Sequence, residues 1–332
     1  MSQHYDGRGG CVAIQKEATL GTAITTDTTA IWVAPKFPFD PKKDENYTDR
    51  VGAQCDSYDA YSQVKSTPNV AFPMVLEAPP SDQLGWMLCA IFGSDTAANV
   101  ESDSYTHTFS KRATGATMPS YTVIVDKSFA QFYFTSCQAS RFRLSVAGNS
   151  PIVSTTLDLV GQDETSHSGM GSPSYPDLDP FVWDDIAFAI ADSDDYTLAP
   201  GTKIESLEWD YNLNPEIQRG AGGSGKVTEV IPANITETCT VGLLIRSDYV
   251  TEFRNKYHNN TAINFQFRLR GDAISSSYYY QLERKIRNMR ATVHPTEEMV
   301  AGLMRTTVTL KRFGNTSSDD SCVLTNLRTS AY

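Results

Sequence analysis

The sequence lacks any hydrophobic run that could cross a bilayer. The longest, near Leu84–Phe92, is far shorter than the roughly 20 apolar residues that a membrane helix needs. The first ten residues of the chain, MSQHYDGRGG, lack the apolar core of a secretion signal. The six cysteines are scattered without a Cys-x-x-Cys pair, and the five histidines lack metal-ligand spacing. We therefore expect reduced thiols, no membrane insertion, no bound metal and no cofactor.

Positive charge is also scarce. The chain has 28 Lys and Arg residues against 39 Asp and Glu residues, a formal net charge of -11. A surface of this sign repels phosphate, so the composition disfavours a protein that seeks nucleic acid.

Catalytic motifs are missing or incomplete. Gly220–Val227, GAGGSGKV, fits the spacing of a phosphate-binding loop, but Val227 stands where Ser or Thr would hold magnesium. The Asp-rich turns lack the spaced oxygen ligands of an EF-hand, and no G-x-S-x-G elbow occurs. We expect a flexible hairpin tip at Gly220–Val227 and no enzyme.

Aromatic residues are abundant, with 15 Phe and 16 Tyr, and favour strands. One pattern occurs twice. Residues 69–93 alternate as a strand and continue as a helical stripe behind Ser81, a candidate N-cap. Residues 238–259 do the same behind Ser247, with Val250, Phe253 and Tyr257 as the stripe. A strand pair and a long hairpin follow each copy, the first hairpin turning at Gly148 and Asn149.

These patterns predict a mainly β fold of two tandem β-sandwich or barrel domains, each with one packed α-helix and a long loop. The first domain is expected at residues 1–165 and the second at 199–313. A Gly-, Pro- and Asp-rich stretch at 166–198 is typical of an acidic linker. Residues 314–332 are polar and weakly patterned, which indicates a C-terminal arm or a disordered tail.

Three stretches resemble the tail tube, or major tail, proteins of long-tailed bacteriophages. Lys16–Asp27 is similar to the opening of that family, a strand followed by a Gly-Thr turn. Phe134–Asp163 resembles its mid-chain hairpin, and Ile204–Leu244 resembles the loop and strand that open its second half. The likeness extends from about Lys16 to Phe313, and the acidic linker and polar tail depart from it.

The resemblance implies a structural virion protein of the duplicated-domain type, whose stacked rings form the conduit for DNA delivery. Two domains per chain imply a homotrimeric ring with pseudo-sixfold symmetry. The implied partners are further copies of the chain, tail tip and terminator proteins, and a tape measure protein in the lumen during assembly. DNA would pass through without specific binding. The implied location is the virion tail, assembled in the host cytoplasm.

Alternation places some polar residues on the face opposite an apolar stripe. Glu208 and Asp210 alternate with Leu207 and Trp209, and Asp158 lies between two leucines. We expect Asp158, Glu208 and Asp210 to face the lumen and to repel DNA phosphate, although Lys311 on the matching polar face argues against a uniformly acidic wall. The alternative is an ordinary outer surface.

Two long polar loops occupy equivalent places in the halves, Asp44–Thr67 and Asn214–Lys226. We expect them to stack one ring on the next. The ring-stacking residues expected in them are Asp44, Tyr47, Arg50, Glu216, Arg219 and Lys226.

Two rival functions stay open from the sequence. Another phage ring component, such as a baseplate or terminator protein, would share the fold and cap a tube rather than extend it. A carbohydrate-binding β-sandwich module is suggested by the many Tyr and Trp residues. Filament formation and glycan binding separate these functions from a tube.

Overall fold

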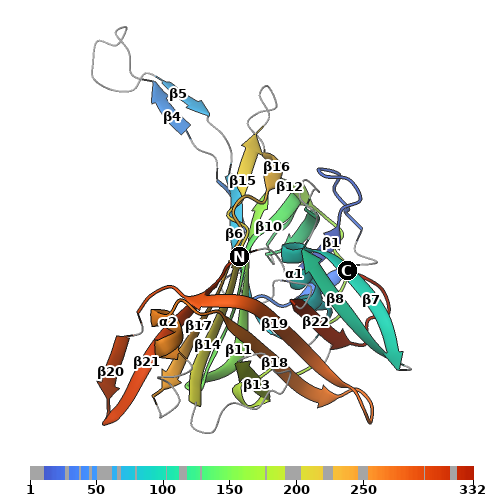
Figure 1. The fold of residues 1–332 in the computed structure, drawn as a ribbon. Helices are drawn as coiled ribbons and strands as arrows, with labels where there is room; N and C mark the ends of the chain where they lie inside the picture. The colour runs from blue at the N-terminus through green and yellow to red at the C-terminus, as the bar shows by residue number, and fades with distance from the viewer. Residues whose placement is uncertain are drawn as a thin grey trace.

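A computed structural model gives the fold (Figure 1). The residues that it describes are 11–26, 30–36, 39–44, 47–50, 62–65, 69–78, 81–101, 103–111, 118–127, 129–175, 178–190, 203–219, 227–245, 253–294, 296–314 and 320–332. The described part is mainly β, as expected. None of its helices is long and apolar enough to cross a membrane.

Six long strands form one antiparallel sheet in the order β6, β11, β10, β14, β17, β21. Their bounds are β6 Asn69–Glu77, β10 Gln131–Ala147, β11 Ser150–Gly161, β14 Lys203–Asn212, β17 Thr236–Leu244 and β21 Leu303–Arg312. Alternate residues on every strand are apolar and buried, such as Phe142, Leu157 and Trp209. The period of two therefore gives this sheet, called the long sheet below, one core face and one polar face.

A second layer packs on the core face. Its strands lie in the order β13, β18, β19, β22, β8, β7, all antiparallel, and cross the long sheet in Figure 1. Aromatic rings fill the space between the layers, with Trp209 against Phe142 and Phe267. The strands are β7 Gly93–Glu101, β8 Ser104–Lys111, β13 Ile186–Ile190, β18 Ile263–Ala273, β19 Tyr279–Ala291 and β22 Ser321–Asn326.

The first part of β10 leaves the long sheet and joins a smaller one, in the order β2, β1, β9, β10, β12. The bend lies at Ser136, whose φ of 53° places it in the left-handed region and breaks the register of β10 with β9 between Phe134 and Cys137. These strands are β1 Cys11–Lys16, β2 Ile31–Val33, β9 Tyr121–Asp126 and β12 Asp163–His167. One long strand thus ties two sheets together.

Helix α1, Asp82–Phe92, forms where the sequence predicts it. The Ser81 hydroxyl accepts a hydrogen bond from the Gln83 N–H at 3.3 Å, as an N-cap does. Gly93 ends the helix with a φ of 93°, a conformation that favours glycine. The second helix, α2, is short, Asn255–His258; Phe253 just before it is buried, while the expected cap Ser247 and Val250 lie outside the described residues.

The same strand pairings occur twice along the chain. In the first half, β11 pairs with β6 and with β10. Strand β10 also pairs with β9 and β12, and β9 pairs with β1. In the second half, β21 likewise pairs with β17 and with β19. Strand β19 also pairs with β18 and β22, and β18 pairs with β13. Asn288, with a φ of 56°, bends β19 where Ser136 bends β10. The pair β7 and β8 belongs to the first half alone among the described strands.

The prediction of an acidic linker at residues 166–198 is wrong for the later part of that stretch. Phe181 is buried, the 3-10 turn η2 covers Trp183–Asp185, and β13 pairs with β18 over five residues. The reason is the short apolar run IAFAI within an Asp-rich stretch, which buries Phe188 and Ala189. The residues 191–198 lie outside the described residues.

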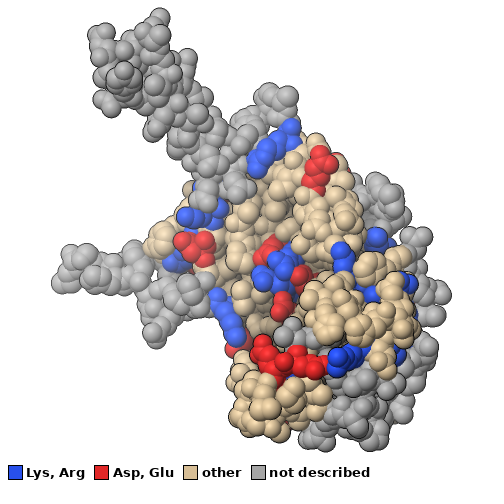
Figure 2. All heavy atoms as spheres, turned by 60° about the vertical axis from the view of Figure 1, so that its left-hand side comes forward, with Lys and Arg blue, Asp and Glu red and all other residues tan. Residues whose placement is uncertain are grey.

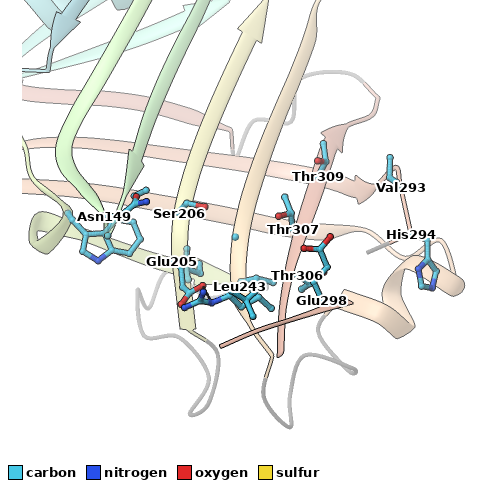
Figure 3. A pocket seen from close by; sticks show the side chains of 17 residues that line it. Asn149, Glu205, Ser206, Leu243, Val293, His294, Glu298, Thr306, Thr307 and Thr309 are labelled. Carbon is cyan, nitrogen blue, oxygen red and sulfur yellow. Dashed lines mark ion pairs between the residues drawn. The ribbon is translucent and has the colours of Figure 1, made fainter. Parts of the chain in front are cut away.

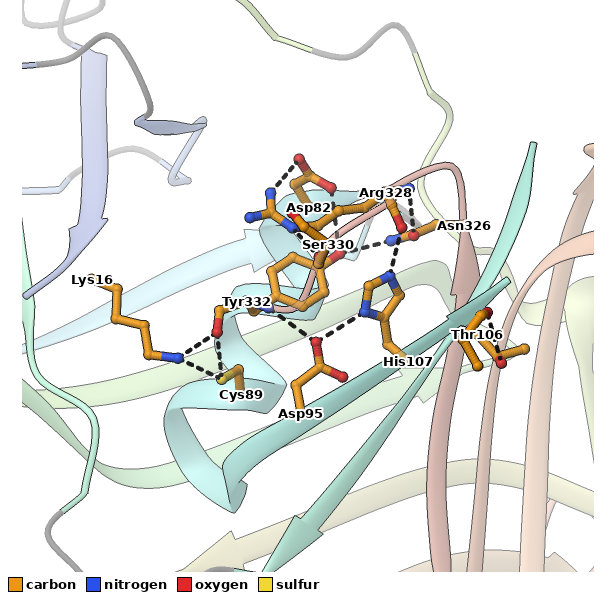
Figure 4. A network of polar contacts seen from close by, with 11 residues as sticks. Lys16, Asp82, Cys89, Asp95, Thr106, His107, Asn326, Arg328, Ser330 and Tyr332 are labelled. Carbon is orange, nitrogen blue, oxygen red and sulfur yellow. Dashed lines mark hydrogen bonds and ion pairs between the residues drawn. The ribbon is translucent and has the colours of Figure 1, made fainter. Parts of the chain in front are cut away.

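A disordered tail is likewise wrong for residues 320–332. Strand β22 pairs with β19 on one side and β8 on the other, so it joins the two halves. Beyond it, Tyr332 is buried against α1, and its ring packs at a tilt on the His107 ring with a centroid distance of 4.9 Å (Figure 4). Asp95 accepts hydrogen bonds from the Tyr332 N–H and bonds the His107 ring, and the Lys16 ammonium donates to the Tyr332 carbonyl. The polar residues of this segment are therefore used in a buried network.

Two hairpins extend from one end of the molecule (Figure 1). The first consists of β4, Tyr47–Arg50, and β5, Ser62–Lys65, and follows the two-residue strand β3, Lys43–Asp44. The second consists of β15, Glu216–Arg219, and β16, Val227–Ile231. A further strand, β20, Thr296–Val300, pairs with β21 at the opposite end and turns through Ala301 and Gly302.

Candidate functional site

The polar face of the long sheet carries the residues that the sequence singled out. Asp158 on β11, Glu208 and Asp210 on β14 all lie on this face, because their neighbours Leu157, Leu207 and Trp209 are buried on the other. The register brings them together: Asp158 is opposite Arg141, and Asp210 is opposite Arg143 on the central strand β10. The three acids are thus neighbours on one continuous surface.

This surface is not acidic overall. Lys and Arg side chains lie next to Asp and Glu side chains on the side of the molecule seen in Figure 2, without a large patch of one sign. The strand register places side chains of both charges on the polar face of the long sheet and on the adjoining end of β19. The acids are Glu77, Asp158, Glu208 and Asp210, and the bases are Arg141, Arg143, Arg290 and Lys311. The described residues of this face thus carry both signs of charge, and the placement of the three acids toward a lumen stays a prediction.

The best-defined charge pair on this face is bidentate. Arg141 donates from Nε to Asp210 Oδ1 at 2.9 Å and from Nη2 to Oδ2 at 2.5 Å. The hydrogen bond to Asp210 raises the pKa of Arg141. Arg141 therefore stays charged, and Asp210 presents no bare carboxylate to whatever faces the sheet.

Asp158 makes no such bidentate pair with any residue that the structure describes. Burial raises the pKa of its carboxyl, while Arg143 and Arg141 lower it. Asp158 is thus the acid on this face whose charge costs free energy in the folded state.

A hollow of about 790 Å³ opens at the end of the polar face near the β10–β11 turn (Figure 3). Ser206, His294 and Glu298 line it and are the residue types of a hydrolytic triad. His294 lies away from Ser206, beyond β17 and β21, with its ring 5.4 Å from that of His258. Glu205 pairs with Arg305 at 3.0 Å. The hollow therefore lacks a nucleophile positioned by a base, and no group of metal-ligating side chains occurs in the described parts of the chain.

The expected stacking residues lie at or near the two extended hairpins. Asp44 ends β3, and Tyr47 and Arg50 are the first and last residues of β4, paired with Lys65 and Ser62. Glu216 and Arg219 begin and end β15, while Lys226 lies outside the described residues. Val227 and Val230 pack on Val160 of β11, and the Val230 N–H donates to Gln138 at 3.0 Å. The second hairpin is thus fixed at its base by the long sheet.

The phage tail tube protein family model matches residues 7–301 of the sequence. The chain belongs to the phage tail tube protein family. It is a structural protein of the virion tail, and the resemblance noted in the sequence is confirmed. No curated protein sequence matches this tail tube protein.

Sequence reasoning missed several residues of these surfaces. Arg141 and Arg143 alternate with Phe142 and Leu144, so the sequence alone could have assigned them to the polar face. Their position beside the three acids depends on strand register, which alternation does not give. The exposed side chains of Ile217 and Ile231 on the second hairpin were also missed, because Ile217 lies between two polar residues and Ile231 directly follows the buried Val230.

Proposed function

We propose that three copies of this tail tube protein form a ring with pseudo-sixfold symmetry, and that stacked rings form the conduit through which DNA leaves the virion. The observation that carries the proposal is the repeated set of strand pairings, which makes each chain two equivalent units joined edge to edge through β10 and β14. Three such chains provide six units, and a closed ring leaves no sheet edge exposed.

The polar face of the long sheet is proposed to be the lumen wall, with Asp158, Glu208 and Asp210 among its residues. Its paired charges neither attract nor hold a polyanion, so DNA slides past a face without net attraction. Replacing the three acids by lysine leaves Arg141, Arg143 and Lys311 uncompensated. We expect that variant to assemble and to retain DNA during ejection; unchanged ejection kinetics contradict a lumen position.

The hairpins β4–β5 and β15–β16 are proposed to stack one ring on the next. They extend from one end of the sheet, and Ile217 and Ile231 expose apolar side chains on the second hairpin, 37% and 40% accessible. Deleting residues 214–226 should leave a folded subunit that forms rings but no tubes. Tubes of normal length from this variant would exclude the stacking role of the second hairpin.

The proposed partners follow from the family: further copies of the chain, tail tip and terminator proteins at the two ends, and a tape measure protein inside during assembly in the host cytoplasm. No catalytic activity is proposed. The deciding experiment is electron microscopy of the purified protein with image averaging. Hollow rings of three chains with near-sixfold appearance support the proposal, whereas monomers at every concentration, or rings of six chains, refute it.

A further inference from the structure

The two halves of the chain differ at one joint. In the first half, the outer edge of β10 pairs with β14 over seven residues, from Arg141 with Asn212 to Ala147 with Ser206. In the second half, β20 is the counterpart of the last residues of β10, because each lies directly before a hairpin turn. The turn after β20 is at Ala301 and Gly302, and the turn after β10 is at Gly148 and Asn149. Within the described residues, β20 pairs with β21 on one edge and with no strand on the other.

Side-chain exposure shows the same difference. Val146 lies two residues before its turn and is 4% exposed, because β14 and the layer above cover it. Met299 lies two residues before the equivalent turn and is 74% exposed. Its cross-strand partner Met304 and the neighbouring pair Val300 and Leu303 are exposed too. Four large apolar side chains at one hairpin tip form a surface that water does not favour.

The first half contains the complementary edge. Strand β14 pairs along β17 from Lys203 to Asn212. Lys36 and the residues 39–44, together called the β14-like segment, lie along β6 in the direction in which β14 runs along β17. Lys43 and Asp44 pair with Val70 and Asn69, the Lys36 N–H donates to the Val75 carbonyl at 2.7 Å, and Phe39 packs on Phe72. This segment has β-strand pairing only over the two residues of β3, although it lies where β14 has ten.

We propose that β20 of one copy pairs with the β14-like segment of the next copy, in the antiparallel manner in which β10 pairs with β14 inside the chain. This inference rests on the proposed ring and identifies its joint between chains. The joint covers the Met299 hairpin tip, gives β20 a partner on its second edge and completes the β14-like segment as a strand. The partner is therefore a second copy of this chain.

The equivalence gives a register that can be tested. Counting from the turns, Val300 corresponds to Ala147. Counting from the first residues of β6 and β17, Val75 corresponds to Gly242, so Lys36, which bonds Val75, corresponds to Ser206, which is opposite Gly242. Ala147 and Ser206 are opposite each other inside the chain, so Val300 and Lys36 should be opposite across the joint. Opposed residues in antiparallel strands have Cα atoms about 4.5–5.5 Å apart, a separation that a disulfide spans.

The experiment is oxidative crosslinking of the assembled protein carrying Lys36→Cys and Val300→Cys, with non-reducing gels as the readout. We expect covalent dimers and trimers that form on assembly and disappear on reduction. The matched control carries Val300→Cys with Asp103→Cys, an exposed residue at the β7–β8 turn, and should stay monomeric on the gel. Equal crosslinking in both variants, or none in the first, refutes the joint.

A second variant separates this inference from the proposed ring. Met299→Asp places a charge on the buried joint and should raise the protein concentration needed for assembly roughly tenfold or more. Phe129→Asp, at a site 60% exposed on the β9–β10 turn, should assemble like the wild type. If wild-type protein forms three-chain rings and Met299→Asp forms them equally well, the joint lies elsewhere while the ring stands. If wild-type protein forms no rings, the proposed function itself fails.

Discussion

Replacing Glu237 by alanine leaves the buried Arg284 guanidinium without its hydrogen-bonded counter-charge. Glu237 lies on β17 and Arg284 on β19, in opposite layers of the sandwich, with side chains only 2% and 3% exposed. Glu237 Oε1 accepts hydrogen bonds from Arg284 Nη2 at 2.5 Å, Arg284 Nε at 3.0 Å and Trp209 Nε1 at 2.9 Å. Burial lowers the pKa of Arg284, but Glu237, Cys322 and Asp320 together outweigh it, so the net pKa is raised.

Breaking a buried pair by removing one partner costs about 3–5 kcal/mol, because the remaining charge keeps its desolvation penalty. We expect Glu237→Ala to lower the free energy of unfolding of the subunit by that amount in urea titrations followed by tryptophan fluorescence. Adding Arg284→Met removes the stranded charge, so the double variant should recover most of the loss. Glu205→Ala is the control: its pair with Arg305 is 39% exposed on both sides and should contribute at most about 1 kcal/mol. A loss below 1 kcal/mol for Glu237→Ala, or a double variant less stable than the single one, would refute the reasoning.

Two further predictions concern pH and thiol reactivity. Burial raises the pKa of Asp158 in the folded state, so its negative charge opposes folding at neutral pH. Asp158→Asn should therefore be more stable than the wild type at pH 7. The difference should vanish as the pH falls below the pKa of aspartate in the unfolded chain, about 3.9. Urea titrations across this range check the prediction, and a variant less stable than the wild type at pH 7 contradicts it. The cysteines Cys137, Cys239 and Cys322 are buried, and burial raises their thiol pKa values, to about 12 for Cys322. These three should resist iodoacetamide in the native protein and react only on unfolding, as peptide mass spectrometry would show; rapid native labelling of Cys239 would contradict the packing between the sheets.

The parts of the fold that the sequence predicts are those set by local chemistry. Ser81 and Gly93 bound a helix because capping and a left-handed φ are properties of single residues, and alternation assigns Trp209 and Asp210 to opposite faces. Strand β22 escaped prediction because only Cys322 and Leu324 give its six residues an apolar period. The charge balance of the polar face escaped too, since the register that places Arg141 beside Asp210 joins residues 69 positions apart. The placement of the three acids toward a lumen stays a prediction.

The joint between β10 and β14 forms within one chain, and this has a consequence for assembly. Two equivalent units that are linked in one chain meet at an effective concentration that does not fall as the protein is diluted. If a ring contains six such units, half of its joints are made when each chain folds, and only the joints between chains depend on how much protein is present. The nucleus of a ring then needs an encounter of three bodies rather than six, so tubes can start at lower subunit concentrations than separate units would require.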